Sequence, residues 1–476
     1  MINPVAGGNW ATFAEFLRFV VMPLTALRPH LKPLLLLAYP VVLSQLGHVL
    51  VNVCDSVVVG QTGKVPLAAV GVGVSVSTVV MIFGLGLSMG ITPLVAAANG
   101  KRDVQQLGRL LVAGVWLSTL AGLVLAVAGT GVASLLRYLG QTAEVVALAA
   151  PWVRIMFLSF LPLMVFQGFK QFAEGLGLTR QAMYLSVLAN IVNAGLCVML
   201  VFGKLGVPAF GMIGSAWATL LARILMALLM GAYVLRAARL RPYREAVPSW
   251  LRPDGTTLKR LVGIGAPIGF QMMFEMGAFS FSHIMIGWLG VTPQAAHQIA
   301  INVASVTYMA ASGIAAAATI RVGNLRGLGD AYGARQAGLA AYLLAFLFMA
   351  TMGLLLVAAR HYVPHLYNHD PAVVAQAATL LLIAAAFQVS DGLQVVGLGA
   401  LRGLEDVKIP SLVALLSYWV VALPLGYGLG FLLKLGSIGV WLGLLTGLTL
   451  VAGVLLWRFR QHRVVAVPPT AVLAGR

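Results

Sequence analysis

Long apolar stretches recur along the whole chain, and they constrain the fold more than any other feature. Each has about 20 residues or more, the length that a helix needs to cross a hydrocarbon core about 30 Å thick. Strands of a membrane barrel would instead show alternating segments of about ten residues. We therefore predict an all-α integral membrane protein with 12 transmembrane helices, at about 34–59, 66–98, 108–135, 146–166, 183–203, 211–235, 261–289, 293–320, 337–359, 373–399, 409–433 and 437–457.

The charge distribution predicts the orientation in the membrane. The net charge is +18, but most of the 31 Lys and Arg residues fall at the two ends and in alternate loops. The intervening loops carry few, namely Lys64, Arg137, Lys204, Arg360 and Lys434. By the positive-inside rule both termini lie in the cytoplasm. No loop is long enough to form a basic domain, so membrane lipid is expected as a partner and nucleic acid is not.

The two halves of the chain repeat each other. Residues 60–103 align with 287–330 without a gap at an offset of 227, and EGLGLTR (174–180) resembles RGLEDVK (402–408) at 228. The matched pairs include Gly86 and Gly313, Thr92 and Thr319, Gly100 and Gly327, and Asp103 and Asp330. Six helices per half place both halves the same way up, as two six-helix bundles related by a pseudo-two-fold axis along the membrane normal. Parallel repeats of this kind build transporters.

The repeat also predicts the division of the chain. We expect a cytoplasmic N-terminal segment (1–33), an N-terminal lobe (34–235), a cytoplasmic linker rich in Pro and basic residues (236–260), a C-terminal lobe (261–458) and a cytoplasmic tail (459–476). Gly86 and Gly90 have the spacing of a small-residue motif for close helix packing.

Three of the 13 acidic residues lie within apolar helices, namely Asp55, Glu275 and Asp391. A charge at mid-bilayer costs about 3 kcal/mol or more, so such residues usually have a function. Gln388, Ser390 and Gln394 near Asp391 are suited to completing an oxygen shell for Na⁺, or the carboxyls can take a proton. The alternative is a purely structural role, either protonated or salt-bridged, for which Arg223 is the deep counter-charge candidate.

Other polar residues have weaker signals. Asn190 and Asn193 are expected partners for Asp55, although polar contacts between helices would explain all three. Asp370 precedes Pro371 and is predicted to cap a helix. Tyr308 offers a cation–π face to a ligand. His361, His365 and His369 recur every four residues, but Pro364 breaks the helix that a metal site of this spacing would need.

Several function classes lack support. No P-loop, HExxH, GxSxG or Rossmann fingerprint occurs, so we expect neither an enzyme nor a cofactor. Cys54 and Cys197 both lie in predicted helices and suggest no disulfide framework.

The segment AAHQIAINVASVTYMAASGIAAAATIRVGNLRGLGD (295–330) closely resembles the multidrug and toxic compound extrusion (MATE) family. FQVSDGLQVVGLGALRG (387–403) and the region of Asp55 and Gly60 also resemble it, and the acidic pair on helices 7 and 10 is similar to the NorM-like branch. The resemblance covers about 34–458.

The resemblance implies roles for particular residues. Glu275 and Asp391 would bind the coupling cation, Na⁺ or H⁺, and Asp55 would be a second acidic position in the N-terminal lobe. Asp370 and Tyr308 would line the drug pocket, and Phe274 and Gln388 beside the carboxylates are further candidate substrate contacts. Many members carry a second Asn four residues after the position of Asn193, where this chain has Cys197.

These observations predict a secondary antiporter that exports amphipathic organic cations. One alternative is a lipid-linked oligosaccharide flippase, which would need a basic central cavity for pyrophosphate. Another is a membrane-embedded transferase, which would need an acidic cluster such as DxxxD at a membrane face, and the sequence has none. No heptad-like or large polar region indicates self-association, so we expect a monomer.

Overall fold

A computed structural model describes residues 24–138, 142–204, 206–247 and 249–462. Within these ranges every regular element is helical, which confirms the predicted all-α class. The first half contains α2 (Leu24–Gly60), α3 (Lys64–Met89), α4 (Ile91–Lys101), α5 (Val104–Leu135), η1 (Leu136–Tyr138), α6 (Ala143–Leu158), α7 (Phe160–Gly175), α8 (Thr179–Phe202) and α9 (Met212–Arg236).

The second half follows a connector made of η2 (Ala238–Leu240) and α10 (Arg241–Glu245). It contains α11 (Gly255–Gly287), α12 (Val291–Gly327), α13 (Ala331–Ala359), η3 (Val363–Leu366), α14 (Pro371–Gly403), α15 (Lys408–Leu416), η4 (Ser417–Ala422), α16 (Leu423–Tyr427), η5 (Gly428–Leu432) and α17 (Gly436–Gln461). Eleven helical segments of the described chain are long and apolar enough to cross a membrane, and α2 contains the predicted first span.

Several predicted helix limits were wrong. The predicted helix at 66–98 divides at Gly90 into α3 and α4, and the one at 146–166 divides at Ser159 and continues to Gly175. Many helices also run past the apolar stretch, as α12 does when it ends at Gly327 instead of residue 320. Hydropathy marks only the part of a helix in contact with lipid, whereas the hydrogen-bonded helix continues into the polar region.

Aspartates set several helix starts. Asp103, Asp254 and Asp330 accept hydrogen bonds from the backbone N–H of Gln106 (2.9 Å), Thr257 (3.0 Å) and Gly333 (2.7 Å) at the starts of α5, α11 and α13. Hydrogen bonds from the Thr257 side chain and backbone hold the pKa of Asp254 below its usual range. These caps satisfy N–H groups that have no partner within the helix.

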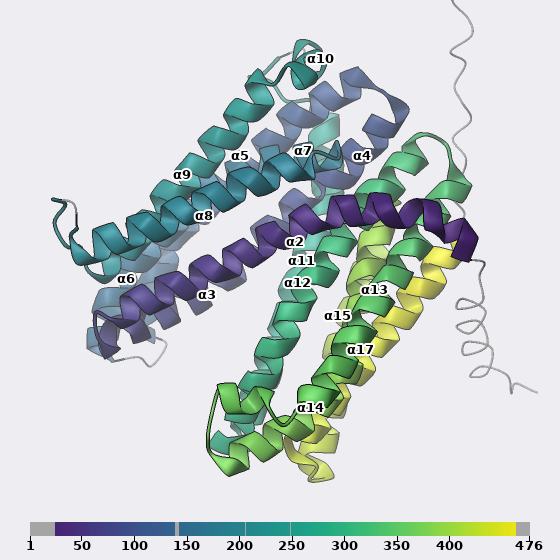
Figure 1. Cartoon of the computed structure of the whole chain (residues 1–476). Coiled ribbons are helices and arrows are strands. Elements are labelled where there is room, and N and C mark those ends of the chain that lie inside the picture. The colour runs from purple at the N-terminus through teal and green to yellow at the C-terminus, as the bar shows by residue number, and fades with distance from the viewer. Residues whose placement is uncertain (1–23, 139–141, 205, 248, 463–476) are drawn as a thin grey trace, which may run out of the picture.

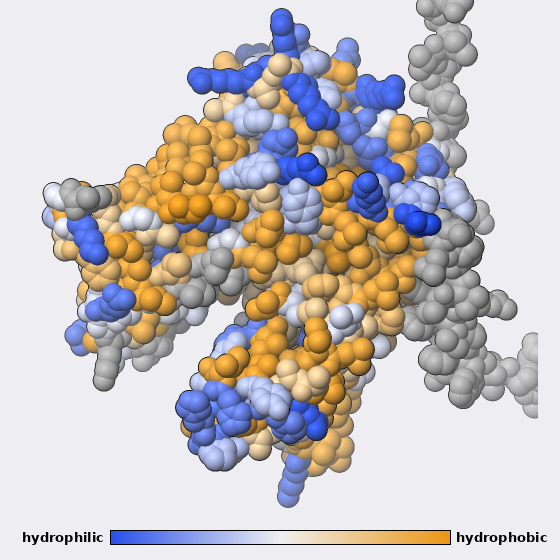
Figure 2. Space-filling view, viewed as in Figure 1, coloured by the Kyte–Doolittle hydropathy of each residue, from blue (hydrophilic) through white to orange (hydrophobic). Residues whose placement is uncertain are grey.

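The helices form two bundles that meet at one end and diverge at the other (Figure 1). α2 through α9 pack together on the N-terminal side and α11 through α17 on the C-terminal side, while α2 and α4 contact α12, and α3 contacts α11, across the junction. Figure 2 shows the surface hollowed between the two arms. Hydrophilic residues gather at the end that carries α10 and at the arm tips, with apolar surface between them.

α2 belongs to both bundles. Its first half buries Leu27, Leu34 and Ala38 in the same core as α12 and α13, and its second half packs on α8. Residues 24–33 of the predicted N-terminal segment therefore continue this helix, whereas residues 1–23 and 463–476 lie outside the described part of the chain.

The bundle junction depends on glycines at equivalent positions of the repeat. A Cβ on Gly100 would lie 2.1 Å from the Asn324 carbonyl oxygen, and one on Gly327 would lie 2.1 Å from the Ala97 oxygen. The offset of the repeat relates one contact to the other, so the pseudo-two-fold axis passes between the ends of α4 and α12. At the α3–α11 crossing, Gly86 faces Gly269 with no room for a side chain, which confirms the predicted close packing.

Gly327→Ala is expected to destabilise the protein by about 1–3 kcal/mol, because the added methyl group overlaps a backbone atom of the other bundle. Chemical unfolding in detergent measures this change. Gly453→Ala is the matched control, since nothing lies within 4 Å of its Cβ position in α17. Alanine favours a helix over glycine by about 1 kcal/mol, so the control should be neutral or stabilised. Equal stability of Gly327→Ala and the wild type would contradict the close junction.

Candidate functional site

Glu275 is the centre of a polar cluster inside the C-terminal bundle. The Gln271 side-chain amide donates to its Oε2 at 2.8 Å, and the Gln394 amide donates to its Oε1 at 2.8 Å. The Tyr418 hydroxyl lies 3.2 Å from the same Oε1 and 2.6 Å from Gln394 Oε1, so its one proton serves either acceptor. Neutral donors from α11, α14 and η4 thus hold both carboxylate oxygens and stabilise the charged form.

Local helix geometry places these groups. Gln271 and Glu275 are one turn apart on α11, so their side chains meet on one face. Tyr418 lies in the π-helical segment η4, just before α16, in which Pro424 has no N–H to donate to the preceding turn. Such π-helical turns often occur at functional sites. Here the wide turn carries the hydroxyl that faces Glu275.

Arg402 supplies a positive charge to this cluster through Gln271. Its Nη2 donates to Gln271 Oε1 at 2.7 Å, and the guanidinium is also within electrostatic reach of Glu275. Arg402 is buried and follows Asp391 by eleven residues on α14, which puts both on one helix face about 16 Å apart. The Gln271 amide therefore accepts from a cation at one end and donates to the carboxylate at the other.

Asp391 and Gln388 lie in the same region but have fewer hydrogen-bond partners than Glu275. Asp391 is 5% exposed and within electrostatic reach of Glu275, yet no residue of the described ranges donates a hydrogen bond to it. Gln388, one turn earlier, is 1% exposed, and neither polar atom of its side chain has a partner in the described structure. The predicted neighbour Ser390 instead pairs with Thr449 at 2.8 Å. Oxygen atoms without donors are suited to a cation or a proton.

Two other predicted substrate contacts, Tyr308 and Phe274, have different surroundings. Tyr308 on α12 is half-buried and within electrostatic reach of both Glu275 and Asp391. The Phe274 ring stacks on Phe270, with centroids 6.2 Å apart, and its carbonyl accepts from the Trp419 indole at 3.0 Å. The structure thus brings Tyr308 to the carboxylates and places Phe274 beside the α3–α11 crossing.

Asp370 lies at the start of α14, far from this cluster. Its carboxylate accepts from the Ala372 backbone N–H at 2.8 Å, which confirms the predicted cap. Twenty helical residues separate Pro371 from Asp391, a rise of about 30 Å along α14.

Asp55 has a smaller polar cluster of its own in the N-terminal bundle. Thr219 donates to Asp55 Oδ2 at 3.4 Å, and Asn193 donates to Thr219 at 3.4 Å, so Asn193 reaches Asp55 through that hydroxyl. Cys197 is also within electrostatic reach of Asp55. The cysteine at the family's second asparagine position therefore lies near the carboxylate.

Arg223 and Asn190 belong to the N-terminal bundle, away from Glu275. Arg223 donates to the Ser159 hydroxyl at 2.6 Å, lies 5.5 Å from the Phe160 ring centroid and is within electrostatic reach of Asp55. The Asn190 side-chain nitrogen is buried with no partner in the described part of the chain. The hypothesis that Arg223 is the counter-charge for Glu275 was wrong, because its partners belong to the N-terminal bundle, and Arg402 has that position instead.

Sequence reasoning missed Arg402, Gln271, Tyr418 and Thr219 as members of the two clusters. Arg402 appeared to be an ordinary basic residue at a membrane edge. A usable signal was its spacing from Asp391, because eleven residues return to the same helix face. Tyr418 gave no such signal, since only the packing of η4 against α11 brings it to Glu275.

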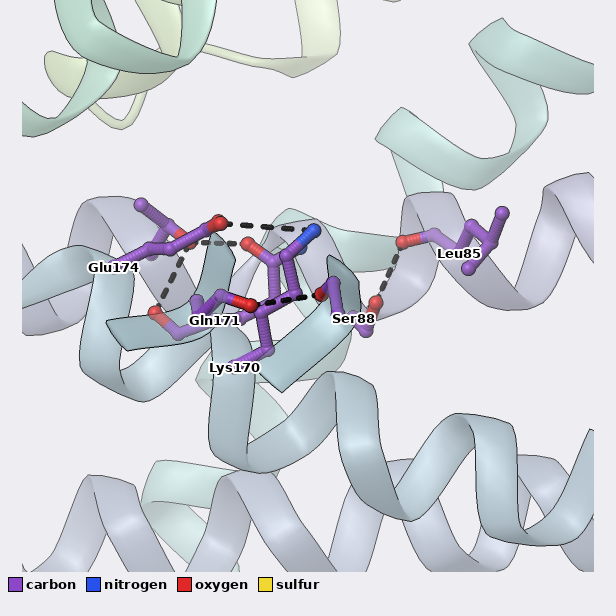
Figure 3. A network of polar contacts seen from close by, with 8 residues as sticks. Leu85, Ser88, Lys170, Gln171 and Glu174 are labelled. Carbon is purple, nitrogen blue, oxygen red and sulfur yellow. Dashed lines mark hydrogen bonds and ion pairs between the residues drawn. The ribbon is translucent and has the colours of Figure 1, made fainter. Parts of the chain in front are cut away.

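A buried ion pair lies in α7, apart from both clusters (Figure 3). Lys170 Nζ is 3.6 Å from Glu174 Oε1, and the two side chains are 8% and 6% exposed. Between them in sequence, Gln171 accepts a 2.5 Å hydrogen bond from the Thr92 hydroxyl of α4. The pair therefore lies beside the α4 helix of the bundle junction.

The repeat relates this ion pair to Arg402. Thr92 donates to the Gln171 carbonyl at 3.3 Å, and the equivalent Thr319 donates to the Gly399 carbonyl at 2.8 Å. In the same alignment Glu174 corresponds to Arg402. The two bundles thus retain the same hydroxyl-to-backbone contact but have opposite charges at one buried position.

Two bundles of membrane-length helices with carboxylates buried inside them define a membrane transporter built from parallel repeats. The family model for MatE matches residues 40–199 and 267–428, which together make up most of the chain. The chain belongs to the MATE family of membrane transporters, as the sequence resemblance predicted. Members of this family work without a cofactor.

Comparison with known proteins agrees with this assignment. The chain is 36% identical over 457 residues to a probable multidrug resistance protein NorM of Rhodopseudomonas palustris, covering 95% of each chain. It is 34% identical over 448 residues to one of Rhizobium meliloti, covering 93% of this chain and 96% of the relative. These values confirm the NorM-like resemblance.

Solved structures share the fold. The eukaryotic MATE transporter AtDTX14 superposes with a TM-score of 0.83 at 22% identity, covering 92% of this chain and 97% of its own. An outward-facing MATE family transporter of the MOP superfamily superposes with a TM-score of 0.82 at 22% identity, covering 90% and 95%. Such neighbours have 12 transmembrane helices in two bundles, as predicted for this chain.

Proposed function

We propose that the protein is a secondary antiporter that exports amphipathic organic cations in exchange for Na⁺ or H⁺. The observation that carries the proposal is the C-terminal cluster, where Glu275 is held by neutral donors, and Asp391 and Gln388 lie nearby with no hydrogen-bond donor among the described residues. Such a site can take up one cation in a bundle interior. We expect drugs and dyes as substrates, and the relatives' name of probable multidrug resistance protein supports the drugs.

Exchange requires the two cations to compete. Two single positive charges about 6 Å apart repel by about 3 kcal/mol at an effective dielectric constant near 20, a factor of more than one hundred in affinity. Linkage makes this reciprocal, so the coupling ion releases the substrate and the substrate releases the ion. In the proposed cycle, the coupling ion enters the site while the two bundles are open toward the outside. The bundles then change to a state open toward the cytoplasm, in which the site binds new substrate. Asp55 would add a second cation position.

Tyr308 is the substrate contact that we favour among the predicted ones, because it lies near both carboxylates. We also propose that the protein acts as a monomer in the bacterial inner membrane, with both termini in the cytoplasm. The basic linker at the end where the bundles meet supports that orientation.

The lipid-linked oligosaccharide flippase is less well supported. Binding a pyrophosphate needs free positive charge in the central region. Three bases inside the bundles already have an acceptor or a counter-charge: Arg402 has Gln271 and Glu275, Arg223 has Ser159 and Asp55, and Lys170 has Glu174. These contacts favour a cationic substrate.

Dye transport by the purified protein in liposomes tests the proposal. We would load ethidium and impose either a Na⁺ gradient at equal pH or a pH gradient without Na⁺. One gradient is expected to accelerate export about 5- to 150-fold, the usual range of coupling between two ligand sites, and thereby to identify the ion. If the export rate were the same with the Na⁺ gradient, with the pH gradient and without any gradient, this result would contradict antiport. Movement of a fluorescent lipid-linked oligosaccharide instead would favour the flippase.

A further inference from the structure

A cavity lies where α13 ends and α14 begins, at the end of the helices remote from Glu275. Its volume is about 470 Å³, and its polar wall consists of Arg360, His361, His365 and His369. Three successive pieces of chain supply these groups: the residue after α13, the turn around η3, and the residue before the cap of α14. Neither cation cluster uses any of them.

The arrangement does not suit a metal ion. Within the described ranges, no group of three or more His, Cys, Asp or Glu side chains is placed to hold one. Pro364 lies in η3 and prevents the continuous helix that would bring histidines four residues apart onto one face. Basic groups spread around the wall of a cavity suit a larger anion, such as a phosphate group, which offers several acceptor oxygens.

The acidic residue next to the cavity, Asp370, uses its carboxylate to cap the start of α14. Its carboxylate caps the Ala372 N–H at 2.8 Å, and its own N–H donates to the Asn368 side chain at 2.8 Å. The charged and titratable groups at the cavity are therefore Arg360, the three histidines and this capping carboxylate. With that carboxylate bonded to the backbone, Arg360 supplies a permanent positive charge at the cavity, and the three imidazoles supply further N–H donors.

The opposite wall of the cavity is apolar and continues along the helices. Pro371, Val374, Ala375 and Ala378 of α14 form it, together with Thr379, whose hydroxyl donates to the Ala375 carbonyl at 3.1 Å. Alongside, α13 exposes Leu354 (72%) and Leu355 (56%), as expected for a surface that faces lipid tails. Tyr362 is 77% exposed in the turn between the helices, a place where tyrosines are enriched at the membrane boundary. The cavity thus spans the boundary between headgroups and hydrocarbon.

We propose that this cavity binds an anionic phospholipid of the adjacent leaflet, with the phosphate against Arg360 and the histidines and an acyl chain along α14. The basic wall complements a phosphate, and the apolar wall complements the chain attached to it. A water-soluble phosphate would match only the first wall, and an uncharged lipid only the second.

Native mass spectrometry of the full-length protein in detergent tests the proposal with three probes. These are dioctanoyl phosphatidylglycerol, dioctanoylglycerol, which lacks the phosphate, and inorganic phosphate as a competitor. We expect saturable binding of the phosphatidylglycerol alone. Arg360→Gln should weaken it about fivefold, since one basic residue near a membrane surface contributes about that factor. The combined variant with His361→Gln, His365→Gln and His369→Gln should also weaken it.

Arg137→Gln is the matched control. Arg137 is an exposed arginine at the end of α5 in the other bundle, its side chain donates to the Ser134 carbonyl at 2.9 Å, and it lines no part of this cavity. It should bind the phospholipid as the wild type does. Equal binding of dioctanoylglycerol, displacement of the lipid by millimolar phosphate, or an equal loss in Arg137→Gln would each overturn the proposal. The wild-type probes decide the question even where the combined variant fails to fold.

Discussion

Glu275→Gln is expected to abolish gradient-driven export while the protein still folds. The change removes the negative charge that would hold the coupling cation. The glutamine carbonyl oxygen can replace Oε1 and still accept from the Gln394 amide, which now donates at 2.8 Å, whereas its NH2 group replaces Oε2 and gives up the hydrogen bond from Gln271. The acceleration of dye export by the ion gradient, about 5- to 150-fold in the wild type, should fall to about onefold. Export rates from liposomes with and without the gradient measure this.

Glu245→Gln is the matched control for that variant. Glu245 pairs with Arg241 in α10 of the connector, where its side chain is 62% exposed. The same chemical change there should leave both the export rate and the gradient dependence at wild-type values. Full gradient-driven export by Glu275→Gln would remove the C-terminal cluster from the mechanism, and Asp55 would become the remaining candidate for the coupling site.

Lys170→Met is expected to destabilise the protein by about 3–5 kcal/mol. The substitution leaves the Glu174 carboxylate 6% exposed without its counter-charge, and removal of one partner of a buried ion pair has about this cost. The double variant Lys170→Met and Glu174→Met should recover most of the loss, because apolar residues of similar volume often replace a buried pair without penalty. The free energy of unfolding in detergent measures both variants.

Arg241→Met is the control for this second prediction. Arg241 and Glu245 have the same spacing of four residues on a helix, but their side chains are 71% and 62% exposed. Solvent screens that pair, so its loss should not measurably change stability. If Lys170→Met were equally harmless, Glu174 would have to be neutral or hydrated in the native protein.

The repeat predicted from the sequence accounts for much of the fold. Residue pairs at a constant offset indicated two similar halves, and in the structure Gly100 and Gly327 make equivalent contacts across the bundle junction. Apolar stretches indicated the spans, because the bilayer requires about 20 apolar residues for each crossing. Helix ends were less predictable, since polar turns beyond the lipid continue the same hydrogen-bonded helix.

The candidate site was only partly predictable. Isolated acids in apolar helices pointed to Glu275 and Asp391 because burying a charge in lipid is costly. The same argument led to Arg223 as the counter-charge, since it is the basic residue deepest in its helix. Arg402 has that position instead, because the packing of α14 beside α11 brings it to Gln271.

The sequence by itself determined the class of protein: membrane-length apolar helices, a parallel repeat and three acids within apolar helices. These are one-dimensional properties, set by hydropathy and spacing along the chain. Only the tertiary structure decided which groups surround each acid, such as Tyr418 at Glu275 and Thr219 at Asp55. The physical reason is that these contacts join residues 143 and 164 positions apart, and helix crossing and rotation, which hydropathy does not encode, bring them together.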